Sequence, residues 1–360
     1  MTDKYKLSFR TLNLINNRLY CLCLYYNCIF YIDLQDYRIH YSGRLECEYS
    51  FQIALSCKAI NYNKGILYSP YYASNIHYFD VTENKDYIID GVHIDLEKNK
   101  YHEIICDDQK CFLIPYIGNE ILVIDMSSRK CIKSISLQEV IFQHNINVKS
   151  NLISESNSYE YKDKYYFALE DKPLLIELDT TEEKIQAINL DEIQGAYSVA
   201  GYQNYLYILS KDKCIITFDI EENKIIDKTA IKENLLLFNS LCNGEDIIFW
   251  QPYKDDFIIF NVISKCVEYR KFNCLFDANK DINEDYKLVG VINDNEFVFI
   301  SDKKNIAFLD IASYDIRREK LLCDDIYIYQ SLMENTYFKK MNLEYTELTL
   351  PAYIDYVIKN

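Results

Sequence analysis

Tyrosine is the residue type whose placement in this chain most suggests a binding chemistry. Three of the five prolines are followed directly by tyrosine, in Ser69-Pro70-Tyr71-Tyr72, Ile114-Pro115-Tyr116 and Gln251-Pro252-Tyr253. Each segment follows an aromatic-rich strand, and Tyr25-Tyr26 stands at the matching point after the first such strand. Proline fixes the backbone where a strand ends, so the next tyrosine would project a flat ring with a polar tip. Several such rings could stack on sugars or hold an extended peptide at little entropic cost.

The candidate binding residues are therefore aromatic and lie where strands end. They are Tyr25, Tyr26, Tyr71, Tyr72, Tyr116, Trp250 and Tyr253. A simpler interpretation stays open, because the chain has 34 tyrosines and these rings could merely seal the ends of the strands.

Residues that could catalyse a reaction or bind a metal form no recognisable motif. Ser69 and Ser210 have no evident His and Asp partners, and the chain contains no Gly-Xaa-Ser-Xaa-Gly elbow or Gly-rich phosphate loop. The densest group of metal-type side chains lacks the helical i, i+4 spacing of a zincin site. Its members are Asp86, Asp90, His93, Asp95 and His102. We predict no catalytic residue, no metal and no cofactor.

The elements that would position the tyrosines recur along the chain. Seven strands of alternating apolar residues each end in an Asp or Asn flanked by apolar residues; these anchors are Asp33, Asp80, Asp125, Asp179, Asp219, Asn261 and Asp310. The mean interval, (310 − 33)/6, is about 46 residues, against roughly 40 to 50 for one blade of a β-propeller. An Asp or Asn at a turn can accept hydrogen bonds from backbone N–H groups two residues on. We therefore expect the anchors to cap turns and to carry no chemistry.

A second feature repeats with the same period. A short polar turn precedes an aromatic-rich strand in every unit, as at Asn16-Asn17, Asn63-Lys64-Gly65 and Gln203-Asn204. Asn, Asp and Gly tolerate the left-handed conformations of tight hairpins, so these turns should join the first strand of each unit to the second. An outer strand follows several anchors, such as Lys133 to Leu137 and Ile225 to Ala230, which gives four antiparallel strands per unit.

This repeat resembles the broad β-propeller superfamily, especially divergent bacterial propellers in which a tyrosine-rich strand precedes an apolar-Asp strand. The resemblance covers roughly residues 5 to 330 and implies an all-β, seven-bladed propeller. It indicates no specific family, because the chain has no recurring Trp-Asp dipeptide and no Gly-Gly pair of the kelch type.

The sequence marks the number of blades and the end of the propeller domain less clearly than it marks the repeat. The interval from Asp125 to Asp179 contains an Asn- and Ser-rich stretch, residues 143–158, that we expect to be a long loop. Residues 322–331 could complete the ring, so six or eight blades stay open as alternatives. We assign residues 1–335 to the propeller and 336–360 to an extension, in which residues 350–359 have the spacing of a short amphipathic helix that packs on the propeller.

The net charge excludes some classes of binding partner, and the cysteines indicate the cellular compartment. A formal charge of −16 opposes binding to nucleic acid or to an anionic membrane, and no apolar run is long enough to span a bilayer. Residues 1–10 mix Lys and Arg with apolar residues, unlike a signal peptide. Thirteen cysteines, an odd number scattered mostly within predicted strands, fit a reducing compartment and buried, inert thiols. We expect a cytoplasmic protein.

These observations favour a non-catalytic binding or scaffold propeller that presents a tyrosine-lined face to a protein, peptide or glycan partner. The alternative is a propeller enzyme, such as a lactonase, glycan lyase or hydrolase, acting at the channel mouth. Such a site needs several polar residues aimed at one point. The predicted innermost strands, near Ile53 to Ile60 and Val289 to Ile292, are mostly apolar, which favours binding.

Overall fold

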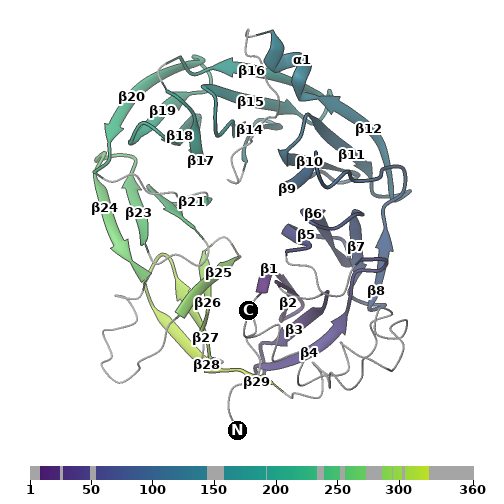
Figure 1. Cartoon of the computed structure of the whole chain (residues 1–360). Helices are drawn as coiled ribbons and strands as arrows, with labels where there is room; N and C mark the ends of the chain where they lie inside the picture. The colour runs from purple at the N-terminus through teal and green to yellow at the C-terminus, as the bar shows by residue number, and fades with distance from the viewer. Residues whose placement is uncertain are drawn as a thin grey trace.

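Seven antiparallel sheets stand around a central axis in the computed structural model (Figure 1). The structure describes residues 9–24, 27–48, 54–143, 158–191, 193–232, 239–251, 256–272, 286–293, 295–301 and 305–323. Within each sheet the chain runs from an innermost strand at the axis to an outermost strand at the rim, so β1, β5, β9, β17, β21 and β25 lie near the centre of Figure 1. The predicted all-β, seven-bladed propeller is confirmed.

The strands of the first four blades follow one another in chain order. Blade 1 holds β1 (Phe9–Ile15), β2 (Arg18–Cys23), β3 (Ile29–Asp33) and β4 (Arg38–Gly43). Blade 2 holds β5 (Ser56–Tyr62), β6 (Gly65–Pro70), β7 (His77–Asp80) and β8 (Lys85–Ile88). Blade 3 holds β9 (Lys100–Cys106), β10 (Lys110–Ile117), β11 (Glu120–Asp125) and β12 (Lys130–Ser136). Blade 4 holds β13 (Tyr159–Tyr161), β14 (Lys164–Ala168), β15 (Leu174–Asp179) and β16 (Lys184–Asn189).

The last three blades repeat this order. Blade 5 holds β17 (Ala196–Tyr202), β18 (Tyr205–Ser210), β19 (Cys214–Asp219) and β20 (Lys224–Ala230). Blade 6 holds β21 (Asn239–Asn243), β22 (Asp246–Trp250), β23 (Asp256–Asn261) and β24 (Val267–Lys271). Blade 7 holds β25 (Tyr286–Ile292), β26 (Glu296–Ser301), β27 (Asn305–Asp310) and β28 (Ile316–Lys320).

The apolar core of the described residues is divided among the seams between blades. In β2, Leu19 and Cys21 join a cluster with blade 7, whereas Tyr20 and Leu22 join a cluster with blade 2. Successive side chains of a strand point to opposite faces, and each face of a blade packs on a different neighbour. The middle strands are therefore apolar on both faces, as β26 illustrates with its burial from Phe297 to Ser301.

The seven anchors cap turns, as predicted. Each anchor ends the third strand of its blade, and its side chain accepts a hydrogen bond from a backbone N–H two or three residues further along the chain. Thr82 N donates to Asp80 Oδ1 at 2.8 Å, and Ser313 N donates to Asp310 Oδ1 at 2.7 Å. The residue four positions after each anchor has a left-handed φ between 49° and 60° in all seven blades. One turn geometry thus recurs in every blade with different side chains.

The ring closes through a short parallel pairing. After blade 7 the chain forms β29 (Leu322–Cys323), which pairs with Arg38 and Ile39 of β4 at the rim of blade 1. Leu322 and Cys323 therefore add a short fifth strand to blade 1 after the seventh blade is complete. The rest of the segment that we considered as an alternative ring closure, residues 324–331, lies outside the described part.

The segment after β12 begins with a helix, where the sequence predicted that the outer strand would continue. The outer strand ends at Ser136, and Leu137 begins a helix instead, α1 (Leu137–Phe142), because the Ser136 side chain accepts a hydrogen bond from Glu139 N and caps it. The expected long loop falls mostly on residues 144–157, outside the described residues, as does the expected C-terminal helix at 350–359. Among the described residues, no helix has the length and apolarity to cross a bilayer.

Candidate functional site

Most innermost strands depart from regular pairing near their first residues. The register against the second strand slips at Arg10 in β1, at Cys57 and Lys58 in β5, at His102 in β9, at Tyr197 in β17 and at Val289 in β25. An extra residue in a strand bends it and redirects side chains, and such bulges are common next to functional sites. We call the end of the ring where the innermost strands begin the mouth face.

Hydroxyl groups hold the bulge of β5 in place. Ser69 Oγ accepts a hydrogen bond from Lys58 N at 3.1 Å and donates one to Lys58 O at 3.0 Å, and Ser56 Oγ donates to the same carbonyl at 2.7 Å. In β1, Thr11 Oγ1 accepts from Leu22 N at 3.3 Å. Buried backbone groups that leave the ladder need such partners. Ser69 therefore has a structural role that positions Lys58.

The structure brings three of the predicted tyrosines together on the mouth face. The rings of Tyr71 and Tyr116 stack with centroids 6.2 Å apart and an interplanar angle of 24°, and Tyr72 contacts Tyr71 edge-on at 4.9 Å. Lys100 Nζ lies 4.3 Å from the centroid of the Tyr72 ring and 5.1 Å from that of Tyr71. All three rings are partly exposed. We call Tyr71, Tyr72, Tyr116 and Lys100 the tyrosine cluster.

Local backbone structure explains how these rings meet. Pro70 ends β6, and the N–H groups of Tyr71 and Tyr72 both donate to Leu55 O just before β5. Pro115, in contrast, lies inside β10, where the pairing with β9 shifts on both sides of it, because proline has no N–H for the ladder. The expectation that a strand ends at this proline is wrong, although Tyr116 still projects beside His102, with ring centroids 6.1 Å apart.

Trp250 occupies a different place from the tyrosine cluster. It ends β22, is 4% exposed and contacts the Phe297 ring edge-on at 5.1 Å across the seam between blades 6 and 7. The remaining candidates, Tyr25, Tyr26 and Tyr253, lie outside the described residues.

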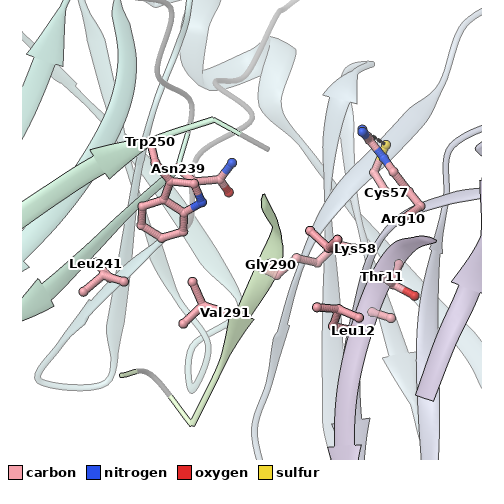
Figure 2. A pocket seen from close by; sticks show the side chains of 12 residues that line it. Arg10, Thr11, Leu12, Cys57, Lys58, Asn239, Leu241, Trp250, Gly290 and Val291 are labelled. Carbon is pink, nitrogen blue, oxygen red and sulfur yellow. Dashed lines mark hydrogen bonds between the residues drawn. The ribbon is translucent and has the colours of Figure 1, made fainter. Parts of the chain in front are cut away.

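A cavity of about 290 Å³ opens between innermost strands from blades 1, 2, 6 and 7 (Figure 2). Trp250 and Asn239 stand on one side, and Arg10, Cys57 and Lys58 on the other. The remaining walls are apolar, from Leu12, Ala59, Leu241, Val289, Gly290 and Val291. We call this space the channel cavity.

Two cationic side chains define one wall of the channel cavity. Arg10 Nη2 donates to Cys57 Sγ at 3.1 Å, and Lys58 Nζ lies 3.1 Å from Glu103 Oε2, whose side chain is 6% exposed. Sequence reasoning missed these residues because it identified the innermost strands as mostly apolar. Arg10 and Lys58 sit at bulges, and no local sequence signal indicates that a strand bulges there.

A buried histidine cluster lies between blades 1 and 2. His77 Nδ1 is 2.7 Å from Asp86 Oδ2, and His77 Nε2 is 3.1 Å from Glu48 Oε1. All three side chains are at most 1% exposed, so they cannot reach a substrate. The carboxylates also accept from backbone, with Glu46 N donating to Asp86 and Ser74 N and Asn75 N donating to Glu48. The cluster fastens the segment after blade 1 onto blade 2.

The members of the candidate metal group are dispersed. Asp86 is held by His77, Asp95 pairs with Lys98, and His102 lies at the mouth face beside Tyr116. No cluster of three or more potential metal ligands occurs among the residues that the structure describes.

The described cysteines comprise one disulfide and free thiols of differing exposure, so the expectation of buried thiols is wrong for part of them: Cys47, Cys242 and Cys266 are exposed. Cys21, Cys23 and Cys28 are free, buried and share the core between blades 1 and 7, and burial raises the pKa of the Cys21 thiol. Cys106 and Cys111 form a disulfide, because they face each other across the β9–β10 hairpin. The two cysteines are five residues apart, and this spacing predicts a disulfide only if the residues between them are known to form a hairpin turn.

Comparison with known proteins identifies the architecture. No family model and no curated protein sequence matches the chain. The solved structure of the computationally designed Ika8 protein is similar, with a TM-score of 0.57 and 8% identity over 88% of each chain. So is BamB from Moraxella catarrhalis, with a TM-score of 0.55 and 11% identity over 81% of this chain and 82% of its own. At these identities the likeness shows the fold alone: the chain is a seven-bladed β-propeller.

Proposed function

We propose that this propeller is a non-catalytic binding protein whose mouth face presents tyrosines to a protein, peptide or glycan partner. The observation that carries the proposal is the stacked pair of Tyr71 and Tyr116, which come from adjacent blades and lie 6.2 Å apart. Two rings that are already aligned lose little conformational freedom when a partner packs against them. Tyr72 and Lys100 extend this surface with a hydroxyl and an amine.

The charge of the chain supports the choice of partner class. A formal charge of −16 disfavours nucleic acid and anionic membrane surfaces, both of which attract basic proteins. We therefore propose a protein, peptide or neutral glycan as partner. The many free thiols support the cytoplasm as the proposed compartment, whereas the Cys106–Cys111 disulfide is a feature rare in cytosolic proteins. We further propose that residues 1–335 form the binding unit and that residues 336–360 are an extension with a short amphipathic helix packed on it.

The test compares three baits in native lysate and on an immobilised glycan panel. They are the wild type, the double variant Tyr71→Ala/Tyr116→Ala and the control Tyr161→Ala/Tyr314→Ala, which removes two tyrosines from the opposite end of the ring. We expect a partner that the wild type and the control capture and the mouth-face variant loses. Capture by the mouth-face variant at the wild-type yield would refute the proposal, and the glycan panel would separate a sugar from a protein or peptide.

A further inference from the structure

We propose that the channel cavity is a second binding site, separate from the tyrosine cluster, for a compact uncharged amide or lactam with an apolar body. The cavity has a volume of about 290 Å³. Small-molecule pockets measure roughly 300 to 1,000 Å³, so this one is near the lower limit and suits a single ring with one polar substituent. Its walls come from blades 1, 2, 6 and 7, whereas the tyrosine cluster joins blades 2 and 3.

Asn239 and Trp250 form the polar part of the wall on blade 6. They are direct cross-strand partners at the ends of β21 and β22, where the pairing is regular. Directly opposite residues of an antiparallel pair project from the same face of the sheet, with Cβ atoms about 5 Å apart. Figure 2 shows the Asn239 amide and the ring nitrogen of Trp250 on the side that faces Gly290. This wall therefore presents an indole N–H donor beside an amide that both donates and accepts.

These two side chains are complementary to an amide. The carbonyl oxygen of the ligand would accept from Trp250 Nε1–H, and its N–H would donate to the carbonyl oxygen of Asn239. Trp250 is 4% exposed and packs edge-on against Phe297, so its N–H is oriented before a ligand binds. The hydrogen bond drawn among the lining residues in Figure 2 joins Arg10 to Cys57 and involves neither Asn239 nor Trp250.

The apolar walls would take the body of the ligand. Leu241 lies two residues after Asn239, on the same face of β21, and it packs with Val291 in the seam between blades 6 and 7. Across the cavity, a Cβ on Gly290 would stand 3.3 Å from Leu12 Cδ1, so a larger residue at this position would narrow the space between blades 7 and 1. Burial of an apolar ring here would supply affinity, and the polar pair would supply orientation.

The charged wall of the cavity favours an uncharged ligand. Arg10 Nη2 donates to Cys57 Sγ at 3.1 Å, and Lys58 Nζ lies 3.1 Å from Glu103 Oε2. Both cations are therefore engaged within the protein. An anion that recruited Lys58 would leave the Glu103 carboxylate, 6% exposed, without its ion pair, and a cation would be repelled by both side chains. An uncharged amide disturbs neither interaction.

The experiment uses benzamide as the probe and acetophenone as its counterpart of nearly the same shape, in which a methyl group replaces the NH₂ group. Both probes are uncharged and both carry the carbonyl group. Trp250 is the only tryptophan of the chain, so its indole N–H gives one NMR signal that reports on this cavity. Titration calorimetry gives the dissociation constants.

Two variants remove one polar group each. Asn239→Leu removes the amide at similar volume, and Trp250→Phe removes the N–H and keeps an aromatic ring. The matched control Asn243→Leu makes the same substitution at the other end of β21, outside the cavity. A second control, Tyr71→Ala/Tyr116→Ala, removes two rings of the tyrosine cluster.

We expect benzamide to shift the Trp250 signal and to bind about fivefold more tightly than acetophenone, because one hydrogen bond between uncharged groups contributes that much. Asn239→Leu should make the two probes bind equally. Trp250→Phe should weaken both by a similar factor, because its N–H meets the carbonyl group that both probes share, and this variant serves if Asn239→Leu does not fold. Both controls should leave the two dissociation constants unchanged.

Three results would overturn the proposal. They are an unshifted Trp250 signal up to about 10 mM benzamide, equal affinity of the wild type for the two probes, and a preference for benzamide that persists in Asn239→Leu. Loss of benzamide binding in the tyrosine variant would refute the separation of the two sites. Failure of partner capture together with intact benzamide binding would count against the proposed function of the mouth face alone.

Discussion

His77 Nδ1 lies 2.7 Å from Asp86 Oδ2 in the seam between blades 1 and 2, and Glu48 holds the other ring nitrogen. Burial alone would lower the pKa of His77, but the charges of Asp86 and Glu48 and their hydrogen bonds outweigh it and raise the pKa from 6.5 to about 9. Burial would likewise raise the pKa of Glu48, yet hydrogen bonds from His77, Ser74 and Asn75 hold it below its usual value. An imidazolium between two carboxylates therefore joins the blades.

This cluster predicts a loss of stability at alkaline pH. Because the folded-state pKa of His77 exceeds the unfolded value of 6.5, its contribution is complete below 6.5 and disappears as the pH rises through about 9. The full effect on the free energy of unfolding is on the order of 3 kcal/mol. Denaturant unfolding between about pH 6 and about pH 10 measures it. His77→Gln should be less stable at neutral pH and should lack this part of the pH dependence; the same alkaline slope in both proteins would contradict the assignment.

The hydrogen bonds of the anchor turns predict that the Asp80 side chain stabilises the fold. Asp80 Oδ1 accepts from Thr82 N, Thr82 Oγ1 and Glu83 N at 2.8, 2.7 and 3.1 Å. Asp80→Ala removes all three bonds, and we expect a loss of about 1 to 2 kcal/mol in the free energy of unfolding. Asp80→Asn keeps the acceptor and is the matched control, with most of the stability retained. Chemical denaturation that finds both variants equally destabilised would argue against the cap.

Close packing of Gly201 against Tyr159, at the seam between blades 4 and 5, predicts that a larger side chain at position 201 destabilises the fold. A Cβ on Gly201 would stand 2.2 Å from Tyr159 Cδ1, so Gly201→Ala must displace the ring, whose hydroxyl donates to Gln203 O. We expect a loss of about 1 to 3 kcal/mol. In a Tyr159→Leu background the same substitution should cost clearly less, which a double-mutant cycle by denaturant unfolding determines. Additive effects would show that the ring is not the obstacle.

The Cys106–Cys111 disulfide predicts sensitivity to reductant. Closing so short a loop is expected to contribute about 2 kcal/mol, so a reductant should lower the thermal midpoint of the wild type and leave that of Cys106→Ala/Cys111→Ala unchanged. Cys47→Ser, at an exposed free cysteine, is the control and should respond like the wild type. Peptide mapping without reductant checks the link directly, and recovery of both peptides unlinked would contradict it.

The proposed C-terminal extension predicts a mild effect of truncation. Removal of residues 340–360 should preserve the β-sheet circular dichroism spectrum and lower the thermal midpoint by a few degrees, because a packed helix buries some apolar surface of the propeller. Loss of the folded spectrum would mean that the propeller domain extends beyond residue 335.

The sequence alone determined the architecture, because the features that build a blade are local. An anchor such as Asp125 caps its own turn, Asn63 adopts its own left-handed φ, and the alternation of apolar residues within one strand fixes which faces are buried. Each of these depends on residues a few positions apart, so a repeat of such signals predicts a propeller of seven blades before any contact between blades is known. Six or eight blades stayed open as alternatives, because the closure of the ring depends on the pairing of β29 with β4, which are far apart in the chain.

Only the tertiary structure decided which side chains share a site. Tyr71 and Tyr116 were candidates from their prolines, but their stacking depends on how blade 2 packs against blade 3. We predicted Trp250 as a member of the same aromatic site. It lies between blades 6 and 7 instead, on the opposite side of the channel cavity from Arg10. The cavity forms because β1 and β5 bulge and because the ring brings blade 1 next to blade 7. The bulges and the closure of the ring both depend on packing between residues that are far apart in the chain.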